Sequence, residues 1–393
     1  MTSKHWTSRR GAALVGFFAA VGAGIACTDA GDDDLTRRAY VVSEEHEDLA
    51  VIDLDKLEVI ARIPTGGSGN HMADLNLDFS KAYVTSGSTN EVIVIDVRKL
   101  QVVKRIKVGA HPTHLTLRPG GKLLSVMVEG DGAVTFIDTA TDEIKKTLPG
   151  FYTPHFMRYA SDGKYGYVAN MEAHHITRVD LDTLTIESEI GLEGMTVPSM
   201  APDEGGFADA QIASDGVLYA ANRTTGRVLV YDTIARTRLP EITVGRRPWM
   251  VYAEHPFAKL PLRHMAPNFD DKTVSLIDGQ KRMTMKALEG DSEAYGVNYS
   301  PLVPDKAFVM NRVREDIAVV DTAKGEITAR IAVGGTTETA STTPDGRWVV
   351  ATVSSAGAVV VIDTMTNAII KRFEGLGKYP WAVTIPNGQN YCH

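Results

Sequence analysis

The chain of 393 residues contains only two cysteines, Cys27 and Cys392, and no run of eighteen or more apolar residues beyond its N-terminal region. Two cysteines are too few for a disulfide framework, and the missing apolar run excludes a transmembrane helix from the body of the chain. The formal net charge is −8 without a basic stripe, which argues against nucleic-acid binding. The chain also lacks a nucleophile elbow, a phosphate-binding loop and a dinucleotide fingerprint, so no standard enzyme class is indicated.

The first 27 residues have the pattern of an export signal. Arg9 and Arg10 precede an apolar stretch at 11–25 that is too short to span a membrane comfortably. This pattern predicts a signal peptide over residues 1–27, and the paired arginines resemble those of a twin-arginine export signal. We therefore expect a periplasmic or outer-envelope protein.

The signal peptide ends in Gly24-Ile25-Ala26-Cys27, which resembles a bacterial lipobox. The cysteine of such a segment is lipidated after cleavage, so Cys27 is the expected lipidation site and the lipid is the expected attachment to the membrane. Residues 28–38 are partly acidic and are interpreted as a tether. If Cys27 carries no lipid, a disulfide bridge to Cys392 is the open alternative.

A short β-rich run that ends in aspartate recurs eight times. The aspartates are 42 to 52 residues apart, at Asp53, Asp96, Asp138, Asp180, Asp232, Asp278, Asp321 and Asp363. Each run is followed by a half-exposed strand, a loop, a third strand and a turn into a fourth, and four strands make one propeller blade. The sequence therefore predicts an all-β fold, a single eight-bladed β-propeller over residues 39–393. The aspartates are expected to cap turns rather than to act in catalysis.

The two ends of the chain are expected to share one blade. Residues 39–43 read as a second strand, followed by strands at 49–53 and 58–63. The missing first strand is found near the other end, at 381–385. Pairing of this C-terminal strand with the N-terminal blade closes the ring and removes open sheet edges, which otherwise invite aggregation.

Polar and aromatic residues gather where the first strand of each blade begins. In a propeller these strands line the central channel and their entries ring one mouth. The entries and the connections that reach the same face contain His46, His71, His111, His114, His155, His174, His175, Asp209, Arg223, Trp249, Tyr295, Arg312, Arg314, Glu338 and Trp381. Two longer inserts, at 193–206 and 255–268, are expected to add loops there. Such a mouth suits a flat anionic ligand, a metal or a peptide, unless these side chains merely plug the channel.

Four segments of the chain resemble parts of known propellers. Lys81-Ala82-Tyr83-Val84-Thr85-Ser86 and Gly166-Tyr167-Val168-Ala169-Asn170 resemble strands of the YVTN family of bacterial β-propellers. Asn70-His71-Met72-Ala73-Asp74 and the segment 264–274 resemble parts of the haem d1 domain of cytochrome cd1 nitrite reductase and of the related NirF propellers of haem d1 biosynthesis. This cytochrome d1-like resemblance implies that His71 is the proximal ligand of a haem iron and that His264 lies on the distal side.

The resemblance also implies a cofactor, haem d1 or a related tetrapyrrole, whose iron takes an axial imidazole. His114 and His155 are expected at the same mouth, and Arg246 and Arg247 are expected to bind the carboxylates of the ligand. Ser300 falls near the position of the family's second distal histidine, and no Cys-x-x-Cys-His motif is present for an attached haem. Nitrite reduction by the chain alone is therefore not expected, and a binding role in haem d1-type cofactor assembly is the first hypothesis.

Two alternatives remain open at this point. One is a non-catalytic periplasmic or cell-surface scaffold that binds an envelope protein, because a repeat fold specifies no activity. The other is a lactonase- or dehydrogenase-like enzyme in which Glu338 and Asp209 hold a metal. The pair Cys392-His393 is a weak metal-binding signal, since it offers two ligands only.

Overall fold

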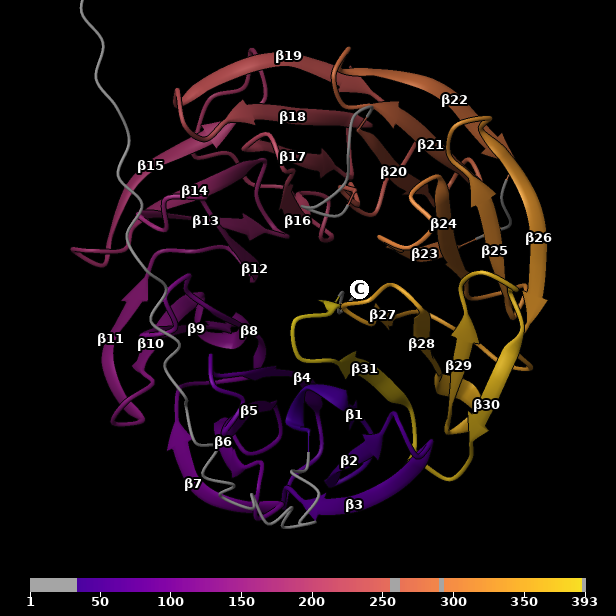
Figure 1. The fold of residues 1–393 in the computed structure, drawn as a ribbon. Helices are drawn as coiled ribbons and strands as arrows, with labels where there is room; N and C mark the ends of the chain where they lie inside the picture. Colours follow the sequence, from indigo (N-terminus) through magenta and orange to yellow (C-terminus); the bar gives the residue numbers. More distant parts are fainter. Residues whose placement is uncertain (1–33, 255–261, 290–292, 391–393) are drawn as a thin grey trace, which may run out of the picture. The chain divides into compact units, whose positions relative to one another are not determined.

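The computed structural model describes residues 34–254, 262–289 and 293–390. Within them, eight β-sheets are arranged around a central axis (Figure 1), which confirms the eight-bladed all-β propeller. The predicted signal peptide with Cys27, residues 28–33 of the predicted tether, residues 255–261 of the second insert and the Cys392-His393 pair lie outside the described residues. The described part contains no helix with the length and apolar character needed to span a bilayer.

Blades 1 to 4 each contain four strands, which follow one another from the axis outward in the order below. Blade 1 consists of β31 (Pro380–Thr384), β1 (Arg38–Ser43), β2 (Asp48–Asp53) and β3 (Glu58–Pro64). Blade 2 consists of β4 (Asn70–Leu75), β5 (Lys81–Ser86), β6 (Glu91–Asp96) and β7 (Gln101–Lys107). Blade 3 consists of β8 (Pro112–Leu117), β9 (Leu123–Val128), β10 (Ala133–Asp138) and β11 (Glu143–Pro149). Blade 4 consists of β12 (Pro154–Tyr159), β13 (Tyr165–Asn170), β14 (His175–Asp180) and β15 (Thr185–Gly191).

Blades 5 to 8 repeat this order with two variations. Blade 5 consists of β16 (Phe207–Ile212), β17 (Val217–Asn222), β18 (Arg227–Asp232) and β19 (Thr237–Thr243). Blade 6 has three regular strands, β20 (Arg263–Asn268), β21 (Thr273–Asp278) and β22 (Met283–Glu289). Blade 7 consists of β23 (Ala294–Tyr299), β24 (Lys306–Asn311), β25 (Asp316–Asp321) and β26 (Glu326–Ala332). Blade 8 consists of β27 (Ala340–Thr342), β28 (Trp348–Val353), β29 (Ala358–Asp363) and β30 (Ile369–Phe373), with the short β32 (Gln389–Asn390) beside β27.

The ring closes as the sequence predicts. The C-terminal strand β31 pairs with β1, so that Val383 lies opposite Val41 and Ala382 opposite Val42. A short 3-10 turn, η1 (Leu35–Arg37), precedes β1, and its Leu35 is buried in the core. The last residues of the predicted tether therefore belong to the propeller.

The pattern of side chains explains the layered core. The two middle strands of a blade are covered on both faces by neighbouring blades, so they are apolar along most of their length, as in β6, where five of six residues are buried. The outermost strands alternate between exposed and covered residues, as in β7, because one face meets solvent. The core is thus a series of apolar layers between adjacent sheets.

The repeated aspartates cap turns, as expected. In each blade the aspartate at the end of the third strand accepts hydrogen bonds from backbone N–H groups two or three residues later: for example, Oδ1 of Asp180 accepts from Asp182 and from Thr183, both at 2.9 Å. The same arrangement occurs at the seven other positions, Asp53, Asp96, Asp138, Asp232, Asp278, Asp321 and Asp363.

The structure of blade 6 differs from the sequence-based prediction in one segment. The insert predicted as a loop over 255–268 ends in β20, so 263–268 is the second strand of the blade. Its inner segment near the axis is irregular: Pro248 and Tyr252 form isolated bridges to Asn268 and Met265. Pro267 has no N–H group to donate, which prevents a continuous ladder here.

Candidate ligand-binding mouth

The inner strands all begin at one face of the propeller, called the mouth below. Six of them carry a β-bulge directly after their first residue, namely β4, β8, β12, β16, β23 and β31. In β4, for example, Asn70 pairs with Ser86 and the next paired residue is Ala73. A bulge re-aims the side chains beside its extra residue, so the residues that follow the first one, such as His71 and His114, do not keep the regular alternation of a strand.

Three histidines from consecutive blades meet there: His71 on β4, His114 on β8 and His155 on β12. Nε2 of His71 lies 3.2 Å from Nε2 of His114, and the ring centroids of His114 and His155 are 4.2 Å apart. His114 is fully buried, whereas the side chain of His71 is 16% exposed. The structure therefore brings together three of the four predicted cofactor-binding histidines, and His71 is closer to solvent than His114.

Two neighbours fix the orientation of His71. Its Nδ1 lies 2.7 Å from Oε1 of Glu44, and the indole Nε1 of Trp381 donates to its Nε2 at 3.1 Å. An indole N–H can only donate, so Nε2 of His71 carries the lone pair. We therefore assign the proton to Nδ1, where Glu44 accepts it.

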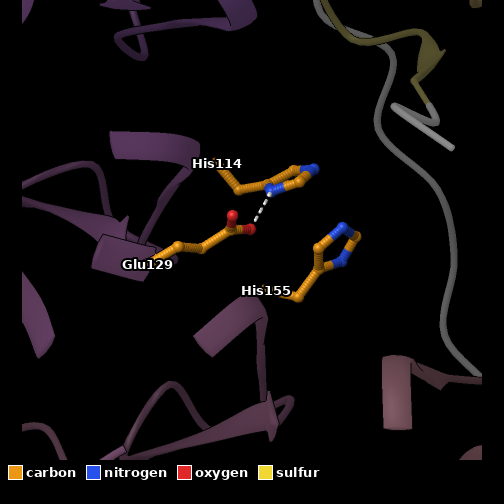
Figure 2. A group of neighbouring side chains, drawn as sticks. All are labelled: His114, Glu129 and His155. Atoms are coloured by element: carbon orange, nitrogen blue, oxygen red, sulfur yellow. Dashed lines mark ion pairs between the residues drawn. The ribbon is translucent and has the colours of Figure 1, made fainter. Parts of the chain in front are cut away.

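Glu129 lies beside the buried end of the cluster. It is the first residue of the 3-10 turn η2 (Glu129–Asp131), and its Oε1 accepts a hydrogen bond from Thr113 at 2.7 Å. The same oxygen lies 3.9 Å from Nδ1 of His114, and Figure 2 shows the two side chains facing each other, with His155 beside them. Burial raises the pKa of the Glu129 carboxyl above its ordinary value.

Blades 6, 7 and 1 supply an aromatic wall on the other side of the mouth. Trp249 stacks on Tyr295 with a centroid distance of 5.0 Å and on Phe269 at 5.7 Å. Trp381 of blade 1 stacks on Tyr379 and contacts Tyr295 edge-on, each at 6.1 Å. His155 lies 6.2 Å from Trp249 and His71 lies 5.2 Å from Trp381, so rings enclose most of the mouth.

Cations rim this wall. The guanidinium of Arg312 lies 3.7 Å from the ring centre of Tyr295, and that of Arg223 lies 4.7 Å from the ring centre of Trp249, as in cation–π contacts. A cleft of about 720 Å³ opens beside them, lined by Glu204, Arg223, Arg246, Arg247, Trp249, Phe269, Asp270, Lys272, Glu293, Tyr295 and Arg312. Five of these residues are cationic and three are acidic, so the lining is positive overall in a chain whose net charge is negative.

Residues 35–246 match the family described as "Domain of unknown function (DUF5074)", a span of more than half of the chain. The chain belongs to this family. No curated protein sequence matches it.

Solved structures show what the fold of this DUF5074 protein is similar to. A structure described as dihydro-heme d1 dehydrogenase NirN in complex with DHE matches with a TM-score of 0.74 and 18% identity, over 91% of this chain and 76% of that one. Apo AztD from Citrobacter koseri matches with a TM-score of 0.61 and 13% identity, over 88% of this chain and 96% of that one. Hydrazine synthase from Kuenenia stuttgartiensis matches with a TM-score of 0.57 and 15% identity, over 83% of this chain and 92% of that one. These likenesses, all below 25% identity, confirm the β-propeller fold.

Arg246 and Arg247, both predicted ligand-binding residues, lie on the rim of the cleft of the DUF5074 protein. Their side chains are 75% and 54% exposed. Arg246 pairs with Asp271 at 2.6 Å, and Arg247 lies 3.9 Å from Asp270. Both guanidinium groups are therefore accessible to an anion from solvent.

His264 is not part of the cluster. It is the second residue of β20, and the end of this strand at the mouth is Asn268, four residues away, or about 13 Å along a strand. Its ring is fully buried, contacts Tyr219 and accepts a hydrogen bond from the backbone of Glu254 at 3.1 Å. Burial lowers the pKa of His264 to about 4. The structure thus gives His264 a core position rather than the distal position implied by the resemblance.

Other predicted mouth residues have local partners of their own. His46 lies 3.1 Å from Asp48, and His174 lies 2.9 Å from the side-chain amide of Asn222. His175 is fully buried, and burial lowers its pKa to about 4. None of these distances connects them to the three clustered histidines.

The two carboxylates proposed for a lactonase-like metal site each have an arginine partner. Asp209 pairs with Arg158 at 2.7 Å, and Glu338 pairs with Arg312 at 2.7 Å. Glu338 also accepts hydrogen bonds from Ser354 and Tyr379. These contacts already compensate both charges, which disfavours a metal at either residue.

Three residues of the mouth, Glu44, Glu129 and Phe269, were not predicted from the sequence. Each is the first residue after the second strand of its blade, as are Arg223 and Arg312. Because that position follows the strand end at the mouth, all five approach the same face. The repeat itself therefore contained the signal that could have identified them.

Proposed function

We propose that the mouth binds a planar anionic tetrapyrrole of the haem d1 type and that the protein acts in the assembly of such a cofactor. One observation carries the proposal. A cluster of three imidazoles on blades 2 to 4 faces a wall of aromatic rings, and arginines rim that wall. The fold match to NirN, a protein described in complex with DHE, supports it.

The side chains fit such a ligand. Glu44 accepts the proton on Nδ1 of His71, so Nε2 carries the lone pair that an iron ion needs. To bind iron, Nε2 must first lose its hydrogen bonds from Trp381 and His114. Trp249 and Tyr295 offer flat apolar surfaces to a macrocycle. Arg246 and Arg247 offer planar donors to its carboxylates.

Each group has a separate task in this proposal. His71 holds the iron, the aromatic wall excludes water from one side, and the arginines fix the orientation of the ring. The bound tetrapyrrole would supply axial ligand exchange and redox chemistry at its iron. Binding and orientation are the roles proposed for the protein.

A titration of the full-length protein with haem d1, and with iron protoporphyrin IX for comparison, tests the proposal. We expect a saturable shift of the Soret band. The shift should be lost in His71→Ala and should require about tenfold more ligand in Arg246→Gln or Arg247→Gln. His46→Ala removes an imidazole outside the cluster and serves as the matched control.

A wild-type protein that shifts neither spectrum would overturn the proposal and favour the envelope-protein scaffold. A shift of equal size in His71→Ala would show that binding occurs without the clustered histidine, and would contradict the assigned role of His71.

We also propose that the chain is exported and anchored in the periplasm or outer envelope through lipid on Cys27. The paired arginines and the lipobox-like segment support this. Labelling of cells with a radioactive fatty acid should mark the wild-type protein and not Cys27→Ala. Unlabelled wild-type protein in the soluble periplasmic fraction would contradict the anchor.

A further inference from the structure

We infer that His114, Glu129 and His155 form a binding site for one divalent transition-metal ion. Their donor atoms, two imidazole nitrogens and one carboxylate oxygen, all lie within 4.8 Å of one another (Figure 2). The site shares no ligand atom with the iron proposed at Nε2 of His71, but that iron would replace the hydrogen bond from His114, so the inference concerns the protein free of tetrapyrrole.

The hydrogen bonds around His71 determine which nitrogen of His114 is available. Nε2 of His71 carries a lone pair, because it accepts from Trp381. Nε2 of His114 lies 3.2 Å from that lone pair and must therefore carry a proton. In a neutral imidazole the other nitrogen then has a lone pair, so Nδ1 of His114 is a potential metal ligand.

That nitrogen faces oxygen atoms. Nδ1 of His114 lies 3.1 Å from the hydroxyl of Thr113 and 3.9 Å from Oε1 of Glu129. The Thr113 proton is directed to Glu129, at 2.7 Å. A lone pair that faces a carboxylate in a buried place is unfavourable unless a cation lies between them. A metal ion supplies that cation without charging the fully buried His114.

The surrounding residues match those of known metal centres. A metal-bound histidine usually donates its other N–H to a second group, and here His114 donates to His71. Two nitrogens and one oxygen at about 2.0–2.2 Å from a zinc ion would stand roughly 3.4 Å apart in tetrahedral geometry. The distance of 3.9 Å between Nδ1 of His114 and Oε1 of Glu129 would have to shorten only slightly to reach this value.

The donor set also limits the metal. Imidazole nitrogen favours zinc, cobalt, nickel or copper over magnesium and calcium, which prefer oxygen ligands. Three protein ligands leave a fourth position for water or a substrate atom. The positions of His114 and His155 on two adjacent inner strands make the site rigid.

Cobalt binding to the full-length protein, stripped with a chelator and free of tetrapyrrole, tests the inference. One equivalent of Co²⁺ should produce visible absorption of the four- or five-coordinate ion, and Zn²⁺ should displace it. Glu129→Gln, or His155→Ala, should weaken binding about tenfold or more. Glu143→Gln, the same change at an exposed carboxylate on the outer strand β11, should bind as the wild type does.

Two results would overturn the inference. One is wild-type protein without visible absorption, which would indicate that His114 is protonated and simply ion-paired with Glu129. The other is unchanged binding in Glu129→Gln. If that variant does not fold, ¹⁵N NMR of histidine-labelled wild-type protein decides: Zn²⁺ should shift two imidazoles, and no shift would refute the site. Because these assays contain no tetrapyrrole, their outcome is distinct from the haem titration.

Discussion

At the scale of single residues, His264 and His71 show how position in a strand determines the role of a histidine. Both belong to segments that resemble the haem d1 family. His71 is at the mouth end of its strand, whereas His264 is at the far end of β20 and packs on Tyr219. A short sequence match identifies the segment but not which end of the blade it occupies.

We predict that His264→Asn leaves tetrapyrrole binding unchanged and reduces the loss of stability in acid. The pKa of His264 is lowered by burial from 6.5 to about 4. Above pH 6.5 the imidazole of His264 is neutral in both the folded and the unfolded state, and the fold keeps its full stability. As pH falls from 6.5 toward 4, the unfolded chain binds a proton that the buried His264 does not, so the free energy of unfolding decreases. The loss is about 3 kcal/mol. Urea unfolding at pH 7.5 and 4.5 measures it, and equal acid sensitivity of variant and wild type would refute the prediction.

Arg158 gives a second prediction at this scale. Its guanidinium pairs with the fully buried carboxylate of Asp209 and so joins blade 4 to blade 5. Arg158→Met leaves that charge without its arginine, so we expect the free energy of unfolding to fall by about 3–5 kcal/mol. Chemical denaturation measures the change.

Arg98, an exposed arginine in a turn, provides the control for Arg158. Arg98→Met should leave stability within about 0.5 kcal/mol of the wild type. The double variant Arg158→Met with Asp209→Val should recover much of the loss, since no buried charge remains. A double variant as unstable as Arg158→Met would show that packing, not charge, explains the effect.

At the scale of strands and turns, much of the structure could be predicted from sequence. The repeated aspartates mark the turns after the third strands, and strand order follows from them because each blade repeats the same connections. The mouth was less predictable. His71 and His114 meet because β-bulges follow Asn70 and Pro112. No feature of the residue pattern predicts either bulge.

The aspartate turns give a prediction for this scale. Oδ1 of Asp96 accepts from the N–H groups of Arg98 and Lys99, and these bonds, with that of Lys99 foremost, lower the pKa of Asp96. Asp96→Ala should reduce the free energy of unfolding at pH 7 by about 1 kcal/mol. A lowered carboxyl pKa stabilises above pH 3.8, so the difference should shrink as pH falls below that value.

Asp96→Asn is the matched variant, because its amide oxygen can still accept from the turn. It should retain most of the stability that Asp96→Ala loses, as measured by urea unfolding. If both variants lose the same amount, the charge of Asp96 and not its turn geometry would be the stabilising feature.

At the scale of the whole molecule, stability depends on closure of the ring. β31 supplies the inner strand of blade 1 and also contacts blade 2, where Thr384 donates to the backbone of Ala73 at 2.7 Å. The short β32 adds two residues beside β27 and bonds Tyr299 through Gln389. β31 therefore closes the ring, and β32 only reinforces it.

A chain that ends after Glu374 should therefore fail to unfold cooperatively and should aggregate, because β1 and the neighbouring blades become open edges. A chain that ends after Gly388 loses β32 alone and should keep a cooperative transition at lower denaturant. Urea unfolding and size-exclusion chromatography distinguish the two. Cooperative unfolding of the shorter chain would contradict closure by β31.

The central claim, that the mouth holds a tetrapyrrole, is tested most directly by the absorption spectrum of the protein purified from its native cells. We predict a coloured protein with a Soret band, and a colourless protein when His71→Ala is produced in the same cells. A colourless wild-type protein from cells that make the cofactor would contradict the claim.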